Sequence, residues 1–287
     1  CADYIKNNGV GLVIGNQAPG IPGAFSAGGD LGYMGGLAKA GKFNEIDAFI
    51  RKVHQTMMGT KYAPFPVVAA PYGMTLGGGC ETCLAADKIV AHCELFMGLV
   101  EIGAGLLPGG CGMVNLWRRY IEGAPAAANI TDLAGLFIPA FMCVAQAKVS
   151  MSAAEARQNG FLRPQDRIVF NKDYLIGEAK KEVLKMVDDG YVPPAKTKIK
   201  VAGREMQGMI WAEMLNMRGG RYITPHMEHI AKTAAFCMSG GDVISGTEVS
   251  EDYLLTLERE AFVDLWKTEN TQKMAEHILK TGKPLMI

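Results

Sequence analysis

The stretch "GMTLGGGCETCLAADKIVAHCELFMGLVEIGAGLLPGG", residues 73–110, decides how this chain folds. Three glycines at 77–79 precede a segment, 80–91, that is typical of a helix passing into a strand. The apolar run "LFMGLVE" at 95–101 predicts another short strand, and "LLPGG" at 106–110 predicts a turn before the next helix. Short apolar strands that alternate with helices are typical of an α/β fold with buried strands.

The segments on either side extend this pattern. "VGLVIGN" at 10–16 and "PFPVVAAPYG" at 64–73 are suited to buried strands, and apolar residues recur at helical spacing within 44–62. Beyond about residue 150 the pattern becomes helical, with glycines at the ends of the expected helices. We therefore divide the chain into an α/β core at 1–149 and a helical region at 150–287.

Composition argues against several classes of protein. The 287 residues are 49% hydrophobic, which is enough for one large globular domain or two ordinary ones. Equal numbers of basic and acidic residues, 29 each, predict neither a nucleic-acid partner nor a membrane partner. The longest apolar run, 133–147, is too short for a bilayer span and contains Pro139, so it predicts a buried helix. Seven cysteines, an odd number, favour a reducing compartment, and we expect the cytoplasm or an organelle matrix.

Three short motifs point to other chemistries, and each has a plainer interpretation. Cys80 and Cys83 have the spacing of a thiol-redox pair, but free cysteines are commonly buried, so we expect core thiols. His226 and His229 would share one helix face, yet no third ligand is placed near them, and we expect no metal site. "GVGLVIG" at 9–15 does not match the dinucleotide-binding fingerprint.

The remaining candidates are two glycine-rich loops and two glutamates. "FSAGGDL" at 25–31 and "LGGGCE" at 76–81 both expose backbone N–H groups, and two such donors from separate loops suit a polarised carbonyl oxygen. Glu81 and Glu101 could then act as acid and base. The plainer alternative is that the glycines only form turns and that both glutamates are solvated.

These residues resemble the core of the enoyl-CoA hydratase (crotonase) family. "FSAGGDL", then 64–91, then "LFMGLVEIGAGLLPGGCG" at 95–112 are similar in order and spacing to the family pattern F-x-A-G-A-D-L, A-x-G-G-G-x-E and P-E-x-x-x-G-x-x-P-G-x-G-G. The resemblance implies a crotonase-type ββα spiral core followed by a C-terminal helical region. Leu99-Val100 and Cys111 depart from the pattern, which puts the position of Glu101 in question.

The resemblance also implies a role for each matching residue. The backbone N–H groups of Ala27 and Gly78 would form an oxyanion hole for the thioester carbonyl of an acyl-CoA, with Glu81 and Glu101 as the catalytic glutamates. No cofactor is implied, since coenzyme A enters as part of the thioester substrate. The positions implied to bind substrate are Ala27, Gly29, Asp30, Gly77, Gly78, Pro108 and Gly109.

The activity implied is that of a lyase, an enoyl-CoA hydratase adding water to a trans-2-enoyl-CoA in fatty-acid β-oxidation. The chain looks most like the hydratase portion of bacterial 3-hydroxyacyl-CoA dehydrogenases, so we expect a homotrimer or a unit fused to, or associated with, a dehydrogenase. "CADYIKNN" at 1–8 looks like the end of a helix, and we expect upstream residues to be missing. The alternatives are an enoyl-CoA isomerase, a non-catalytic acyl-CoA-binding module and a thiol-redox protein based on Cys80 and Cys83.

Overall fold

The computed structural model describes residues 9–16, 23–125 and 133–287, so the helix end expected at 1–8 lies outside the described residues. The strands of the described part are β1 (Leu12–Ile14), β2 (Ala24–Ser26), β3 (Val67–Ala69), β4 (Gly73–Leu76), β5 (Lys88–His92), β6 (Leu95–Gly98), β7 (Arg167–Val169), β8 (Ile199–Lys200) and β9 (Glu248–Val249). A four-stranded sheet has the order β1-β3-β5-β7 and a three-stranded sheet the order β2-β4-β6, all parallel. β8 and β9 form a separate antiparallel pair. These parallel sheets confirm the expected α/β class.

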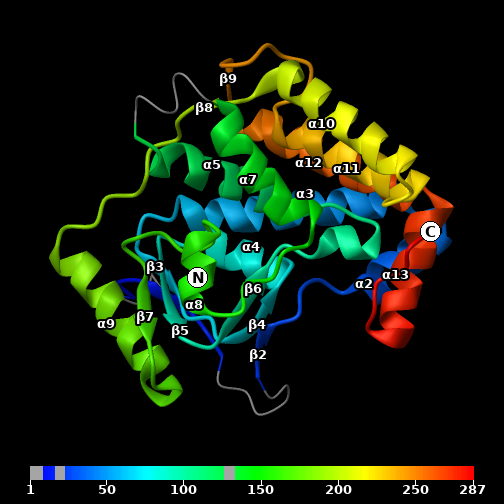
Figure 1. Cartoon of the computed structure of the whole chain (residues 1–287). Coiled ribbons are helices and arrows are strands. Elements are labelled where there is room, and N and C mark those ends of the chain that lie inside the picture. Colours follow the sequence, from blue (N-terminus) through cyan, green and yellow to red (C-terminus); the bar gives the residue numbers. More distant parts are fainter. Residues whose placement is uncertain (1–8, 17–22, 126–132) are drawn as a thin grey trace.

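Helices surround the two sheets (Figure 1). Within the described ranges they are α2 (Leu31–Lys39), α3 (Phe43–Lys61), α4 (Gly78–Leu84), α5 (Gly112–Gly123), α7 (Leu133–Ala145), α8 (Ala153–Gln158), α9 (Leu175–Asp188), α10 (Gly203–Gly219), α11 (Pro225–Met238), α12 (Glu251–Trp266) and α13 (Glu269–Thr281), with 3-10 turns η1 (Glu101–Ala104) and η2 (Lys172–Tyr174). The buried helix expected at 133–147 is α7, which contains Pro139.

The strand β3 is buried on both faces, which explains its unbroken apolar sequence. Val67 and Ala69 face the larger hydrophobic core, while Val68 and Ala70 face a smaller one beneath α9, because successive side chains of a strand point to opposite faces. The helix α9 therefore covers one face of the four-stranded sheet, as Figure 1 shows. The other face carries the main core and the helices of the candidate site.

The C-terminal helices pack in series against the N-terminal ones. α10 packs on α11, α11 on α12, and α12 on α3, while α13 packs on α2 (Figure 1). β7 follows residue 150 in the chain but pairs with β5, so the part after this point contributes to the sheet as well as to the helices. The division at residue 149 stays a prediction.

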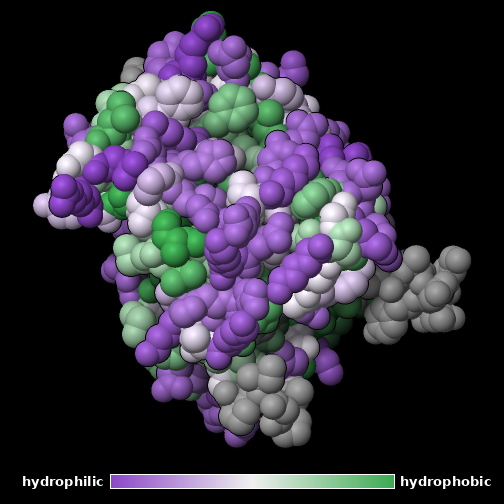
Figure 2. Space-filling model, turned by 90° about the vertical axis from the view of Figure 1, so that its right-hand side faces the viewer, coloured by the Kyte–Doolittle hydropathy of each residue, from purple (hydrophilic) through white to green (hydrophobic). Residues whose placement is uncertain are grey.

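Figure 2 shows one side of the molecule, on which hydrophilic residues predominate and hydrophobic ones form small, separated patches. Such scattered exposure is normal for a globular domain and marks no interface by itself. In the part of the chain that the structure describes, no helix combines the length and the apolar character that a membrane crossing requires.

A glycine is required where β4 begins. Gly73 has φ of +52°, and a Cβ at this position would lie 1.8 Å from the carbonyl oxygen of Gly23, to which Met74 donates a hydrogen bond. We expect Gly73→Ala to lower the free energy of unfolding by more than about 1 kcal/mol, because the β2–β4 pairing must shift.

Urea unfolding measures this effect. Gly208→Ala is the matched control, because Gly208 lies inside α10 with no atom within 4 Å of its Cβ position. This control should gain about 0.5–1 kcal/mol from the higher helix propensity of alanine. Equal unfolding free energies for the two variants would contradict the strain at Gly73.

Candidate active site

The short helix α4 is fixed at both ends. At its start, the Gly77 N–H donates to the carbonyl of Gly98, 2.9 Å away. At its end, buried Arg119 of α5 donates to the carbonyl oxygens of Leu84, at 3.2 Å, and Phe161, at 2.7 Å. Because a buried guanidinium makes these bonds without competition from water, α4 has one orientation against α5.

Glu81 lies in the first turn of α4, and its side chain is buried. Its Oε1 accepts hydrogen bonds from the backbone N–H groups of Gly110, at 2.7 Å, and Gly112, at 3.0 Å. A Cβ on Gly110 would lie 2.4 Å from Glu81 Oε2, so only glycine lets the turn come this close. The alternative in which Glu81 is solvated is therefore wrong.

Glu101 begins the 3-10 turn η1, which follows β6. Its Oε1 lies 3.1 Å from the position that a Cβ would take on Gly77, and its Oε2 is buried without a hydrogen-bond partner in the described part of the chain. The other end of η1 is held by Thr271 of α13, whose hydroxyl donates to the carbonyl of Gly105 at 2.7 Å. Leu99, where the family pattern differs, is fully buried, and its packing holds the segment that leads to Glu101.

The two glycine-rich loops meet beside Glu101. A Cβ on Gly28 would lie 3.6 Å from the Gly78 nitrogen, and a Cβ on Gly78 would lie 3.5 Å from the Gly29 nitrogen. Ala27 and Gly29 are exposed, whereas Gly77 is buried and Gly78 half-buried. The structure thus brings together the two segments whose N–H groups the sequence singles out.

The other positions implied to bind substrate have visible structural roles. Asp30 is exposed and caps α2, its Oδ1 accepting the Tyr33 N–H at 2.9 Å. Pro108 and Gly109 are buried, and a Cβ on Gly109 would lie 2.7 Å from the ring of Phe262 in α12. Their contact with a substrate stays a prediction.

Burial raises the pKa of both glutamates. The pKa of Glu81 lies well above its usual value because the carboxyl is buried, with the negative charges of Glu101 and Glu258 adding to the effect and the N–H bonds from the turn partly offsetting it. Burial likewise raises the pKa of Glu101 to about 7. Loss of hydration and the neighbouring negative charges both favour the protonated form of each carboxyl, so the two do not ionise easily together.

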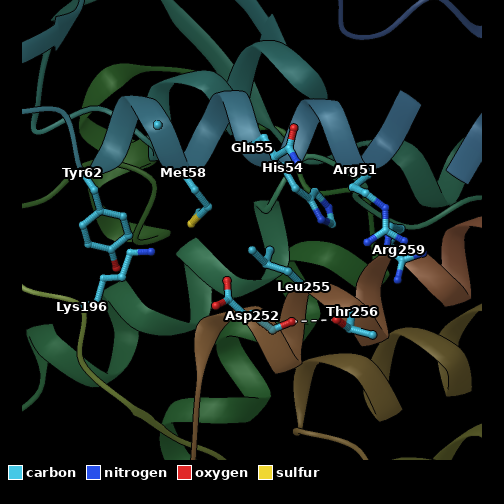
Figure 3. Close-up of a pocket in the computed structure, with 11 residues that line it drawn as sticks. Arg51, His54, Gln55, Met58, Tyr62, Lys196, Asp252, Leu255, Thr256 and Arg259 are labelled. Carbon is cyan, nitrogen blue, oxygen red and sulfur yellow. Dashed lines mark hydrogen bonds between the residues drawn. The ribbon is translucent and has the colours of Figure 1, made fainter. Parts of the chain in front are cut away.

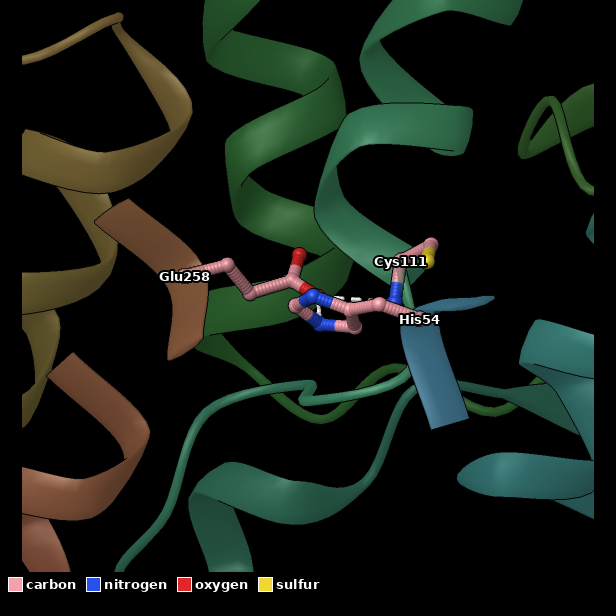
Figure 4. A group of neighbouring side chains, drawn as sticks. All are labelled: His54, Cys111 and Glu258. Carbon is pink, nitrogen blue, oxygen red and sulfur yellow. Dashed lines mark hydrogen bonds and ion pairs between the residues drawn. The ribbon is translucent and has the colours of Figure 1, made fainter. Parts of the chain in front are cut away.

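A third carboxyl, missed in the sequence, belongs to this cluster. Glu258 of α12 is fully buried, and its Oε1 accepts the Cys111 N–H at 2.7 Å and lies 3.3 Å from His54 Nε2 (Figure 4). The sequence contains a signal for its burial, because Glu258 shares the apolar face of its helix with Leu254 and Phe262. A charged residue at such a position is rarely buried without a partner.

His54, Cys111 and Glu258 also offer donor atoms that lie within 4.8 Å of one another, as a metal site would require (Figure 4). However, burial raises the pKa of the Cys111 thiol well above its usual value, and the charges of Glu258 and Glu81 add to this. A bound metal would take the thiolate and would itself lower this pKa, so the raised value describes the metal-free group. Within the group, Glu258 Oε1 accepts the backbone N–H of Cys111, while His54 Nε2 lies in close contact with the same oxygen without a hydrogen bond.

A cavity of about 550 Å³ lies between α3 and α12 (Figure 3). Side chains from the two helices point toward each other across it, with Arg51 and His54 on α3 facing Asp252 and Arg259 on α12, and Tyr62 directly after α3 lines one end. Neither catalytic glutamate of the sequence prediction lines this cavity. It meets the carboxyl cluster only through His54, whose Nε2 faces Glu258.

The two remaining motifs are structural. Cys80 and Cys83 are buried free thiols whose pKa burial raises, the opposite of a thiol-redox pair, so the core interpretation is confirmed. His226 and His229 lie on α11 with ring centroids 6.1 Å apart, and buried His226 contacts the Thr271 hydroxyl at 3.0 Å.

Stability should depend on pH through Glu101. Its pKa is about 7 in the folded protein against 4.5 ordinarily, so between these values the folded state binds more protons than the unfolded state. The free energy of unfolding therefore falls as pH rises through this window. We expect Glu101→Gln to remove part of that fall, which amounts to at most about 1.4 kcal/mol per pH unit for one group.

The check is urea unfolding of both proteins at several pH values between about 5 and 7. Glu45→Gln serves as the control, because Glu45 lies on α3 with its side chain 52% exposed. This control should keep the wild-type slope of the unfolding free energy against pH. A Glu101→Gln slope parallel to that of the wild type would contradict the raised pKa.

Comparisons with known proteins bear on this site. The family model described as enoyl-CoA hydratase/isomerase matches residues 18–186. The chain is 42% identical over 282 residues to a "Probable 3-hydroxyacyl-CoA dehydrogenase" of Bacillus subtilis, covering 98% of this chain and 34% of that protein. It is 27% identical over 256 residues to a Rickettsia prowazekii protein named as a fatty acid oxidation complex trifunctional enzyme, covering 89% of this chain and 32% of that protein. The chain spans about a third of the length of these relatives.

Solved structures agree on the fold. An enoyl-CoA hydratase from Rhodobacter sphaeroides superposes with a TM-score of 0.63 at 19% identity, covering 99% of this chain and 81% of that one. An enoyl-CoA hydratase from Bacillus halodurans superposes with a TM-score of 0.59 at 18% identity, covering 96% of this chain and 86% of that one. At these identities the likeness shows the crotonase-type fold alone. Since the family model matches more than half of the residues, the chain belongs to the enoyl-CoA hydratase/isomerase family.

Proposed function

We propose that this chain hydrates trans-2-enoyl-CoA thioesters in fatty-acid β-oxidation. The observation that carries the proposal is a pair of carboxyls at the two glycine-rich loops: Glu81, buried in the first turn of α4, and half-buried Glu101, which lies beside Gly77 with a buried Oε2. Membership of the family and relatives named for fatty acid oxidation support the same chemistry.

In this proposal the thioester carbonyl oxygen lies at the junction of the loops. The N–H groups of Ala27 and Gly78 donate to it, and they stabilise the negative charge that the oxygen gains when hydroxide adds to Cβ. Because Gly28 and Gly29 lie so near Gly77 and Gly78 that an added Cβ would reach the neighbouring loop, the two donors would be held in place before the reaction begins. One such donor is worth about 10²–10³ in rate.

The two glutamates supply the acid and the base. With one proton shared by the pair, the ionised carboxyl accepts a proton from water as the water oxygen bonds to Cβ, and Cα receives a proton from the protonated carboxyl. The pair ends with the same number of protons as it had at the start. No electrons are lost or gained overall, so the reaction needs no redox cofactor. Coenzyme A takes part as the thioester of the substrate.

Crotonyl-CoA hydration tests the proposal through the loss of its enoyl absorbance. We expect turnover by the wild-type chain and a decrease in kcat of about 10²–10⁴ in both Glu81→Gln and Glu101→Gln, because each removes one proton-transfer group. Glu45→Gln, an exposed change, should retain wild-type kcat. Binding of crotonyl-CoA without turnover by the wild type would refute hydration and point to an acyl-CoA-binding module.

One observation favours isomerisation as a second candidate. Glu81 Oε1 is held by two N–H groups, whereas Glu101 Oε2 has no partner in the described part of the chain, so one carboxyl is better placed to move a proton than the other. Isomerisation of a 3-enoyl-CoA needs one carboxyl to carry a proton between Cα and Cγ. If the wild type isomerises such a substrate without hydrating crotonyl-CoA, and Glu81→Gln retains this activity, the isomerase proposal replaces hydration.

The product of hydration suggests the setting of this unit. Hydration gives a 3-hydroxyacyl-CoA, and a relative of which this chain matches about a third is named as a 3-hydroxyacyl-CoA dehydrogenase. We propose that the unit passes its product to such a dehydrogenase, either fused or associated. The homotrimer and the cytoplasmic location stay predictions.

A further inference from the structure

Glu258 interacts with the same turn that holds Glu81. The turn residues Gly110, Cys111 and Gly112 donate three successive N–H groups, the first and third to Glu81 Oε1 and the second to Glu258 Oε1. The two carboxyls come from α4 and α12, which are far apart in the sequence. The turn is therefore held between two helices by its own backbone.

The middle residue of this turn has an unfavourable backbone conformation. Cys111 has φ of +72°, in the left-handed region, which costs a residue with a Cβ roughly 1–2 kcal/mol. The 2.7 Å bond to Glu258 compensates for part of this cost, and it can form only if the Cys111 N–H points away from Glu81. The bond from Cys111 to Glu258 thereby determines how the flanking N–H groups are directed.

We propose that Glu258 is a positioning residue for Glu81: by accepting the Cys111 N–H, it directs the N–H groups of Gly110 and Gly112 to the Glu81 carboxylate. The proposal rests on the function proposed above, because it assigns Glu81 to proton transfer. His54 of α3 packs against Glu258 with Nε2 at 3.3 Å from Oε1, a close contact without a hydrogen bond.

The negative charge of Glu258 has a separate effect, on proton affinity. It contributes to the raised pKa of Glu81, Glu101 and Cys111. The titratable groups that its charge affects are Glu81 on α4, Glu101 on η1, Cys111 in the turn and Cys237 on α11, and His54 on α3 lies beside it. Removing the charge should lower the pKa of both catalytic glutamates, so the acidic limb of the kcat/KM profile should move to lower pH.

Two substitutions separate the positioning from the charge. Glu258→Gln removes the charge but keeps an oxygen that can accept the Cys111 N–H, whereas Glu258→Leu removes both. The matched control is Glu260→Gln, two residues along the same helix, where the side chain is 60% exposed. All three variants and the wild type are assayed for crotonyl-CoA hydration as a function of pH.

Relative to the wild type, we expect the acidic limb of the kcat/KM profile to move to lower pH in both Glu258 variants and to stay in place in Glu260→Gln. At its own optimum, Glu258→Leu should have a kcat lower than that of Glu258→Gln by a factor on the order of 10 to 100, with little change in KM, because a misplaced catalytic group costs rate more than binding. Equal kcat values for the two Glu258 variants would overturn the proposal.

A second readout does not depend on turnover. In ¹⁵N-glycine-labelled protein, the amide resonances of Gly110 and Gly112 should move further from their wild-type positions in Glu258→Leu than in Glu258→Gln, because both variants lose the charge and only Glu258→Leu loses the acceptor. If the wild type does not hydrate crotonyl-CoA, the proposed function fails while this measurement still decides the positioning. If Glu258→Leu does not fold, Glu258→Met, which also lacks the acceptor, takes its place, and equal displacements of the Gly110 and Gly112 resonances in this variant and in Glu258→Gln overturn the proposal.

Discussion

The hydrogen bonds from the 110–112 turn to Glu81 are the constraint on which the rest of the site depends. A carboxylate inside a protein must find donors, and here the only ones at its Oε1 in the described structure are the N–H groups of Gly110 and Gly112. This requirement brings the turn onto α4. Because η1 lies just before the turn and α5 just after it, the position of Glu101 and the start of α5 follow from the same contact.

The cationic side chains nearby are engaged elsewhere. Arg119 binds carbonyl oxygens and lies 3.7 Å from Asp166, while Lys61 and Arg118 bind Glu251, at 2.6 and 3.2 Å. Glu81 and Glu258 are therefore left with backbone N–H groups and His54 as their neighbours, and Glu101 Oε2 has no hydrogen-bond partner among the described residues. Burial without a cation raises proton affinity rather than lowering it, which suits groups that must exchange protons near neutral pH.

Much of the fold could be predicted from the sequence, because it depends on local patterns. The strands at 12–14 and 67–69 and the helix at 133–145 follow from runs of apolar residues and from helical spacing. The participation of β7 in the sheet could not be predicted, since a three-residue strand carries almost no periodicity and its pairing with β5 spans about 75 residues of chain. Pairing at that distance depends on the packing of the whole sheet.

The same distinction applies to the site. The sequence by itself determined the two glycine-rich loops, the helix that carries Glu81 and the family, because glycine spacing and the residues around it are local features. Only the tertiary structure decided that Glu258 joins Glu81 and Glu101, that Cys111 takes a left-handed conformation and that His54 lies against them. Those contacts join α3, α4 and α12 across more than a hundred residues, and they exist only because burying the apolar face of α12 against α3 and α5 carries Glu258 into the interior.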